Sequence, residues 1–78
     1  MSTTRNISAV TDIRIGLIIK AERNRKRLTL AELSTAIGCK HPTLANYEQG
    51  KRTLPAERVD TIAKVLGLDP RILDPEAA

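Results

Sequence analysis

With 78 residues, one Tyr, no Phe and no Trp, the chain can build one small aliphatic core, which excludes a multidomain enzyme. A single Cys excludes an intrachain disulfide or thiolate metal site, and no apolar run nears the roughly 20 residues of a membrane span, so we expect a soluble, cytoplasmic, cofactor-free protein. The positive charge lies mainly in residues 1–52, with ten Lys and Arg against four Asp and Glu, as is typical of a surface that neutralises phosphates.

The first predicted helix covers about Thr11 to Lys26, because Ile15, Ile18, Ile19 and Glu22 recur at helical spacing. Residues 1–9 are polar and lack an apolar period, so we expect a flexible N-terminal arm, a domain at 10–74 and a tail at 75–78. Ile13 and Leu17 fall on the face opposite the predicted core. They are either a partner or dimer contact, or scattered surface apolar residues.

The second predicted helix begins at Leu30, because Thr29 and Glu32 have the spacing of a capping box, and it ends at Gly38. A third short helix starts with His41 and Pro42 and ends before Gly50, since proline is tolerated in a first turn.

Leu54 and Pro55 open a fourth predicted helix with an apolar stripe, and Gly67 closes it. Asp69 and Pro70 start a last brief turn. The pattern contains no alternating strand, so the sequence predicts an all-α bundle of about five short helices.

The second and third helices have the spacing of a helix-turn-helix. The run Leu28-Thr29-Leu30-Ala31-Glu32-Leu33-Ser34, then Ile37-Gly38, Thr43-Leu44 and Tyr47-Glu48-Gln49-Gly50-Lys51-Arg52, resembles the XRE family of lambda-repressor-like and Cro-like regulators. The resemblance covers roughly residues 13–73. It implies a lambda-repressor-like bundle whose second motif helix enters the major groove of DNA.

The resemblance also implies an ion pair between Arg23 and Glu48 that orients the recognition helix, the alternative being an ordinary surface pair. The positions that read bases in the family correspond here to His41, Pro42, Thr43 and Asn46. Their chemistry agrees in part, because Asn46 can pair bidentately with adenine. The alternative for any one of them is a solvent-exposed residue without a role.

Phosphate contacts are expected from basic and polar groups and from backbone amides at the start of the second helix. The residues concerned are Thr29, Leu30, Lys40, Gln49, Lys51 and Arg52. The sequence departs from the family pattern at Leu30, often Gln, at Lys40, often Ser or Thr, and at Arg27, commonly Gly. Arg27 would need a left-handed backbone unless the first helix ends differently.

The resulting hypothesis is a transcriptional regulator, expected to be a repressor, that binds a pseudo-palindromic operator in double-stranded DNA as a homodimer. The dimer candidates are Leu68, Ile72 and Leu73, or the first helix. Catalysis is not expected, since acid, base and nucleophile groups do not converge. The alternative is an antitoxin-like or other protein-interaction module that binds a partner protein.

Overall fold

The computed structural model describes the backbone of residues 3–74 and the side chains of residues 10–74. Five helices follow one another without a strand in this part of the chain: α1 (Thr3–Arg25), α2 (Leu30–Ile37), α3 (His41–Glu48), α4 (Ala56–Leu66) and α5 (Pro70–Leu73). The predicted all-α bundle is thereby confirmed. The expected tail at 75–78 lies outside the described residues, and the division into arm, domain and tail stays a prediction.

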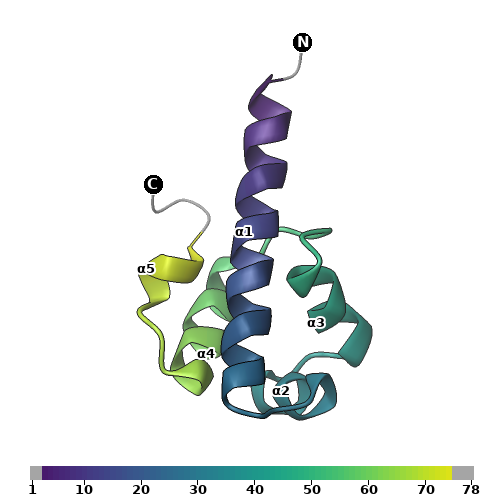
Figure 1. Ribbon diagram of the computed structural model, residues 1–78, viewed down its shortest axis with the longest axis vertical. Helices are drawn as coiled ribbons and strands as arrows, with labels where there is room; N and C mark the ends of the chain where they lie inside the picture. Colours follow the sequence, from purple (N-terminus) through teal and green to yellow (C-terminus); the bar gives the residue numbers. More distant parts are fainter. Residues whose placement is uncertain (1–2, 75–78) are drawn as a thin grey trace.

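Helix α1 is the axis of the molecule (Figure 1). The other four helices lie beside and behind its C-terminal half, with α3 on one side and α5 on the other, while its N-terminal half extends beyond them. Helix α2 contacts both α3 and α4, which closes the bundle at the far end. Among the described residues, no helix is long and apolar enough to cross a membrane.

The start of α1 differs from the prediction, because the helix begins at Thr3 rather than near Thr11. Apolar periodicity marks the part of a helix that is buried, and α1 continues past the point where its burial stops. The segment before Thr11 contains neither Pro nor Gly, so no residue there interrupts the helix.

The core is aliphatic, as expected, with Tyr47 as its one aromatic member. Ile15 and Ile19 of α1 belong to one buried cluster that includes residues of every other helix and of the α3–α4 loop. The other members are Leu33, Ile37, Leu44, Tyr47, Leu54, Val59, Ile62, Ala63, Leu66 and Leu73. Cys39, in the α2–α3 turn, packs against this cluster as a partly buried side chain. The small α5 therefore contributes to the main core through Leu73 alone.

Four of the helices end with a residue in the left-handed conformation. At each end the next residue donates its amide five residues back, as from Leu28 to the carbonyl of Arg23 at 3.1 Å. Three of these left-handed residues are Gly, but α1 ends at Arg27, with φ of 58°. The predicted strain at Arg27 is present, and it costs on the order of 1 kcal/mol.

Candidate DNA interface

The recognition helix α3 has one buried face and one exposed face. Leu44, Tyr47 and Glu48 point inward, with exposed fractions of 0%, 6% and 8%. Helical spacing then turns the other side outward, where His41 and Pro42 are exposed and Thr43 and Asn46 are half-buried. The structure therefore brings all four predicted base readers to the accessible side of α3.

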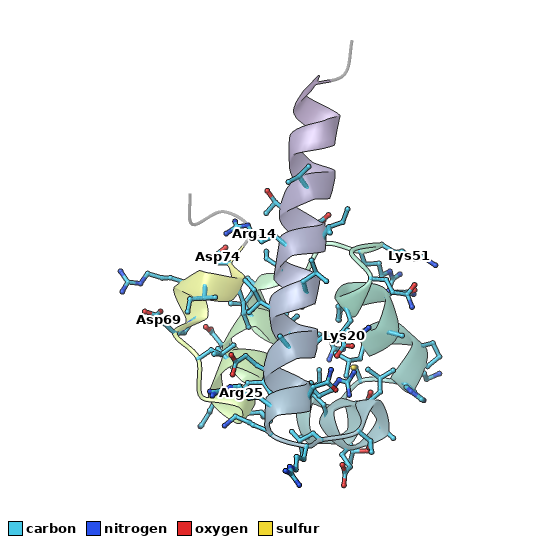
Figure 2. The ribbon with its side chains drawn as sticks, in the orientation of Figure 1. Arg14, Lys20, Arg25, Lys51, Asp69 and Asp74 are labelled. Atoms are coloured by element: carbon cyan, nitrogen blue, oxygen red, sulfur yellow. The ribbon has the colours of Figure 1, made fainter. Side chains whose placement is uncertain are left out.

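Exposed cations lie at both ends of α3. Lys40 precedes the helix in an extended conformation, and its side chain makes no capping hydrogen bond. Gly50 ends the helix at φ of 73°, and the amide of Lys51 donates to the carbonyl of Asn46 at 2.9 Å. The exposed side chains of Lys51 and Arg52 follow directly. Lys51 lies beside the last turn of the helix (Figure 2).

Two glycines allow α1 and the C-terminal end of α3 to approach closely. A Cβ atom on Gly16 would overlap the carbonyl oxygens of Tyr47 and Glu48, and one on Gly50 would lie 2.7 Å from the Cα of Ile13. The hydroxyl of Thr53 also donates to Asp12 at 2.9 Å. Contact with α1 therefore fixes the C-terminal end of α3 and the loop that follows it.

The expected ion pair between Arg23 and Glu48 is present, with both nitrogens of the guanidinium edge bound. Arg23 Nε lies 2.7 Å from Glu48 Oε2, and Nη2 lies 3.0 Å from Oε1. Its Nη1 donates to the carbonyl of Leu28 at 2.9 Å. The two side chains are only 12% and 6% exposed, which distinguishes this pair from an ordinary surface pair.

Hydrogen bonding to Glu48 raises the pKa of Arg23 above its ordinary value, partial burial opposes this rise, and the charge of Glu48 adds to it. The guanidinium therefore stays charged. It joins α1 to α3 through Glu48 and to the α1–α2 loop through Leu28, so the pair positions the helix.

The start of α2 has the predicted capping box, and its hydrogen bonds limit which groups can meet a phosphate. Thr29 Oγ1 accepts from the Glu32 amide at 3.0 Å, while Glu32 Oε1 accepts from the Thr29 amide at 2.7 Å. The Thr29 amide is thus occupied, contrary to the expectation that it is available to a phosphate. The Thr29 hydroxyl hydrogen and the Leu30 amide remain as donors.

A hollow lies between α1, α2 and α3, and the two residues of the ion pair form part of its wall. Its lining residues are Lys20, Arg23, Leu30, Ala45, Glu48 and Gln49. Lys20 is exposed and lies on the side of α1 toward α3 (Figure 2). Lys20 and Ala45 were not predicted from the sequence, although helical spacing indicates both. Lys20 precedes Arg23 by three residues, and Ala45 lies between Pro42 and Gln49 on the outer face of α3.

The predicted dimer candidates have different environments. Leu73 is fully buried and Leu68 packs partly buried against the core, so Leu73 is wrong as a dimer contact. Only Ile72 is strongly exposed, at 45%. Helix α5 is a single turn placed against α1 and α4, and a single turn can point only one of its two large apolar residues into the core.

Among the described residues, no three His, Cys, Asp or Glu side chains form a group that could hold a metal ion. The arrangement is instead a helix with a fixed inner face, an accessible outer face and cations at both ends.

Comparison with known proteins agrees with this geometry. A helix-turn-helix family model matches residues 19–73. The fold is similar to the crystal structure of the restriction-modification controller protein C.AhdI from Aeromonas hydrophila, with a TM-score of 0.73 and 23% sequence identity over 78% of this chain and 92% of that one. A comparison with curated proteins finds no match.

Proposed function

Since the chain belongs to the XRE-type helix-turn-helix family of DNA-binding transcriptional regulators, we propose that it recognises a specific operator through the outer face of α3. One observation supports this most directly. Within the described chain, the side chains of His41, Thr43 and Asn46 make no hydrogen bond, although the inner face of the same helix is fully packed. Their donors and acceptors are therefore available to base edges in the major groove.

Each residue of this face offers different chemistry. Asn46 pairs bidentately with adenine, His41 donates to a guanine acceptor, and Thr43 donates, accepts or offers its methyl group to thymine. Pro42 contributes shape and apolar contact. Ala45, between them, adds a second methyl group for thymine. This face carries one amide side chain, that of Asn46, and few charges. It would therefore distinguish base pairs through a small number of direct contacts.

Phosphate contacts hold α3 in the groove. Lys40 before the helix and Lys51 and Arg52 after it carry exposed positive charges at its two ends. The remaining donors line or border the hollow between α1, α2 and α3: the Thr29 hydroxyl, the Leu30 amide, the Gln49 side chain and the Lys20 ammonium. These contacts set affinity and salt dependence rather than sequence preference.

The proposed role is repression by a homodimer. One α3 helix of eight residues reads only a few base pairs, so two copies on half-sites about one helical turn apart would supply the necessary specificity. Occupation of an operator is sufficient for repression, whereas activation needs a further contact with the transcription machinery. A small DNA-binding domain meets the first requirement by itself.

Selection of bound sequences from random DNA tests the proposal, followed by measurement of salt-dependent affinity. Asn46→Ala should relax preference at one base position, where about 1–3 kcal/mol of discrimination is lost. Lys51→Ala should weaken all sites about equally and lower the salt slope by about one. Lys64→Ala, which removes the same charge from α4, is the control and should change neither.

The reverse pattern, with Lys51→Ala changing base preference and Asn46→Ala changing only the salt slope, would reject this assignment of contacts. Failure to enrich any sequence would reject specific recognition altogether.

A further inference from the structure

The segment that follows α3 carries two of the cations proposed to meet phosphates. We call residues 50–54 the basic loop, because Lys51 and Arg52 are exposed in its middle. The chain between α3 and α4 crosses α1 near the middle of that helix (Figure 1). No main-chain hydrogen bond holds Arg52, Thr53 or Leu54 to another of the described residues. The position of the basic loop therefore depends on packing and on side-chain contacts.

Packing fixes the two ends of the basic loop. At its start, Gly50 lies so close to α1 that a Cβ atom on it would be 2.7 Å from both the Cα and the Cγ1 of Ile13. The side chain of Ile13 thus has a partner within the chain, although 47% of the residue is exposed. At the other end, Leu54 is buried in the core. The part between these two points carries both cations.

A side-chain hydrogen bond restrains the middle of the basic loop. The hydroxyl of Thr53 donates to Oδ2 of Asp12 at 2.9 Å, across 41 positions of sequence. Asp12 directly precedes Ile13 on α1, so the hydrogen bond and the packing on Gly50 act from neighbouring residues of one helix. Thr53 in turn directly follows Arg52. The bond therefore attaches α1 to the residue next to a proposed phosphate contact.

The charge of Asp12 is unfavourable at a surface that meets DNA. Its carboxylate lies beside the residue after Arg52, and phosphates repel a carboxylate. Asp12 forms no ion pair with a Lys or Arg of the described chain, so none of these cations offsets its charge. Charge alone therefore predicts that removal of Asp12 strengthens binding to DNA.

We propose that Asp12 is a positioning residue for DNA binding, which holds the basic loop through Thr53 so that Lys51 and Arg52 are in place for phosphates. Ordering a mobile loop on binding consumes part of the interaction energy, and a loop that is already held avoids this loss. The hydrogen bond thus adds more to affinity than the charge of Asp12 removes. This inference rests on the proposed function, in which both cations contact phosphates.

Two substitutions of Asp12 separate its hydrogen bond from its charge. Asp12→Asn and Asp12→Ala both remove the negative charge, but only asparagine keeps an oxygen that can accept from Thr53. On the selected operator, Asp12→Asn should bind at least as tightly as the unmodified chain. Asp12→Ala should bind about three- to tenfold more weakly than Asp12→Asn. Its salt slope should also be lower, because a loosened loop makes fewer phosphate contacts.

Thr53 tests the same contact from the other side. Thr53→Val keeps the shape of the side chain, removes the hydroxyl and leaves Asp12 charged, so binding should weaken by about three- to tenfold or more. Thr53→Ser keeps the hydroxyl and should bind like the unmodified chain. Adding Asp12→Ala to Thr53→Val should cause no further loss, since the contact is already broken. Further weakening of the double variant would show that the two residues act separately.

Asp60, an exposed carboxylate on α4, provides the matched control. Asp60→Asn and Asp60→Ala should bind the operator equally, because neither changes a contact of the basic loop. Equal binding by Asp12→Asn and Asp12→Ala, or tighter binding by Asp12→Ala, would overturn the proposal and leave charge as the effect of Asp12.

A measurement without DNA separates this proposal from the proposed function. NMR order parameters of the Arg52 and Thr53 amides should fall in Asp12→Ala and stay unchanged in Asp12→Asn. Equal order parameters in the two variants would overturn the proposed restraint. Absence of DNA binding by the unmodified chain would instead contradict the proposed function, and the order parameters would still decide whether Asp12 holds the basic loop.

Discussion

The side chains on the inner and outer faces of α3 differ in how many contacts they make with the rest of the chain. On the inner face, Leu44 and Tyr47 are packed in the core and Glu48 holds two hydrogen bonds from Arg23. On the outer face, the side chains of His41 and Asn46 have no hydrogen-bond partner within the described residues. Fold and recognition thus depend on different residues of one short helix, so a residue of the outer face can be changed with little effect on the fold.

The largest expected effect comes from the inner face. Glu48→Ala leaves the guanidinium of Arg23 partly buried without its carboxylate, and removal of one partner of a buried pair costs about 3–5 kcal/mol of unfolding free energy. Chemical denaturation measures this loss. Glu48→Gln keeps the size and one acceptor oxygen, so it should lose less. An alanine variant as stable as the original would indicate that the pair behaves like an ordinary surface pair.

Gly16→Ala should have the next largest effect. In the middle of an exposed helix this change normally stabilises by about 0.5–1 kcal/mol. Here the new methyl group meets the backbone of Tyr47 and Glu48, which cannot rotate away, so we expect a loss of about 1–3 kcal/mol. Thermal unfolding gives the sign, and Ala21→Gly on the exposed side of α1 provides the comparison. A gain in stability from Gly16→Ala would show that α1 and α3 can separate at little cost.

The smallest effect on stability is expected on the outer face. Asn46→Ala removes a half-buried side chain without a hydrogen bond in the described chain, and substitutions of this kind stay within about 0.5 kcal/mol. Its unfolding midpoint should match that of the unmodified protein, even though its base preference changes. A clear loss of stability would mean that the two faces of α3 are not independent.

Most of the fold could be predicted because its helix ends are encoded locally. The capping box at Thr29 and the glycines at positions 38, 50 and 67 mark boundaries through the backbone conformations they favour. The start of α1 could not be found in this way, because Ser and Thr, which can cap a helix, occur at several positions between Ser2 and Thr11, and no Pro or Gly singles out one of them. Periodicity located the buried part of that helix, and the structure extends beyond this part.

The sequence predicted which residues form the site better than it predicted the contacts that these residues make. The outward position of His41 and Asn46 follows from helical spacing, and the pairing of Arg23 with Glu48 follows from the family resemblance. Lys20 was missed because its part in the hollow depends on how α1 packs against α2 and α3, which is a tertiary property. Leu73 was misassigned for a related reason, since the sequence does not indicate which residue of a single turn faces the core.

Arg27 places a positive charge on the surface at the cost of some stability, because its backbone is held in the left-handed conformation. A glycine there would adopt the left-handed conformation without strain, yet the position carries an exposed cation in the loop that leads into α2. The strain is confined to one residue, because the amides on either side of it still find their carbonyl partners. The residue type at position 27 thus sets both the backbone strain and the surface charge at the end of α1, and it does so without altering the path of the backbone.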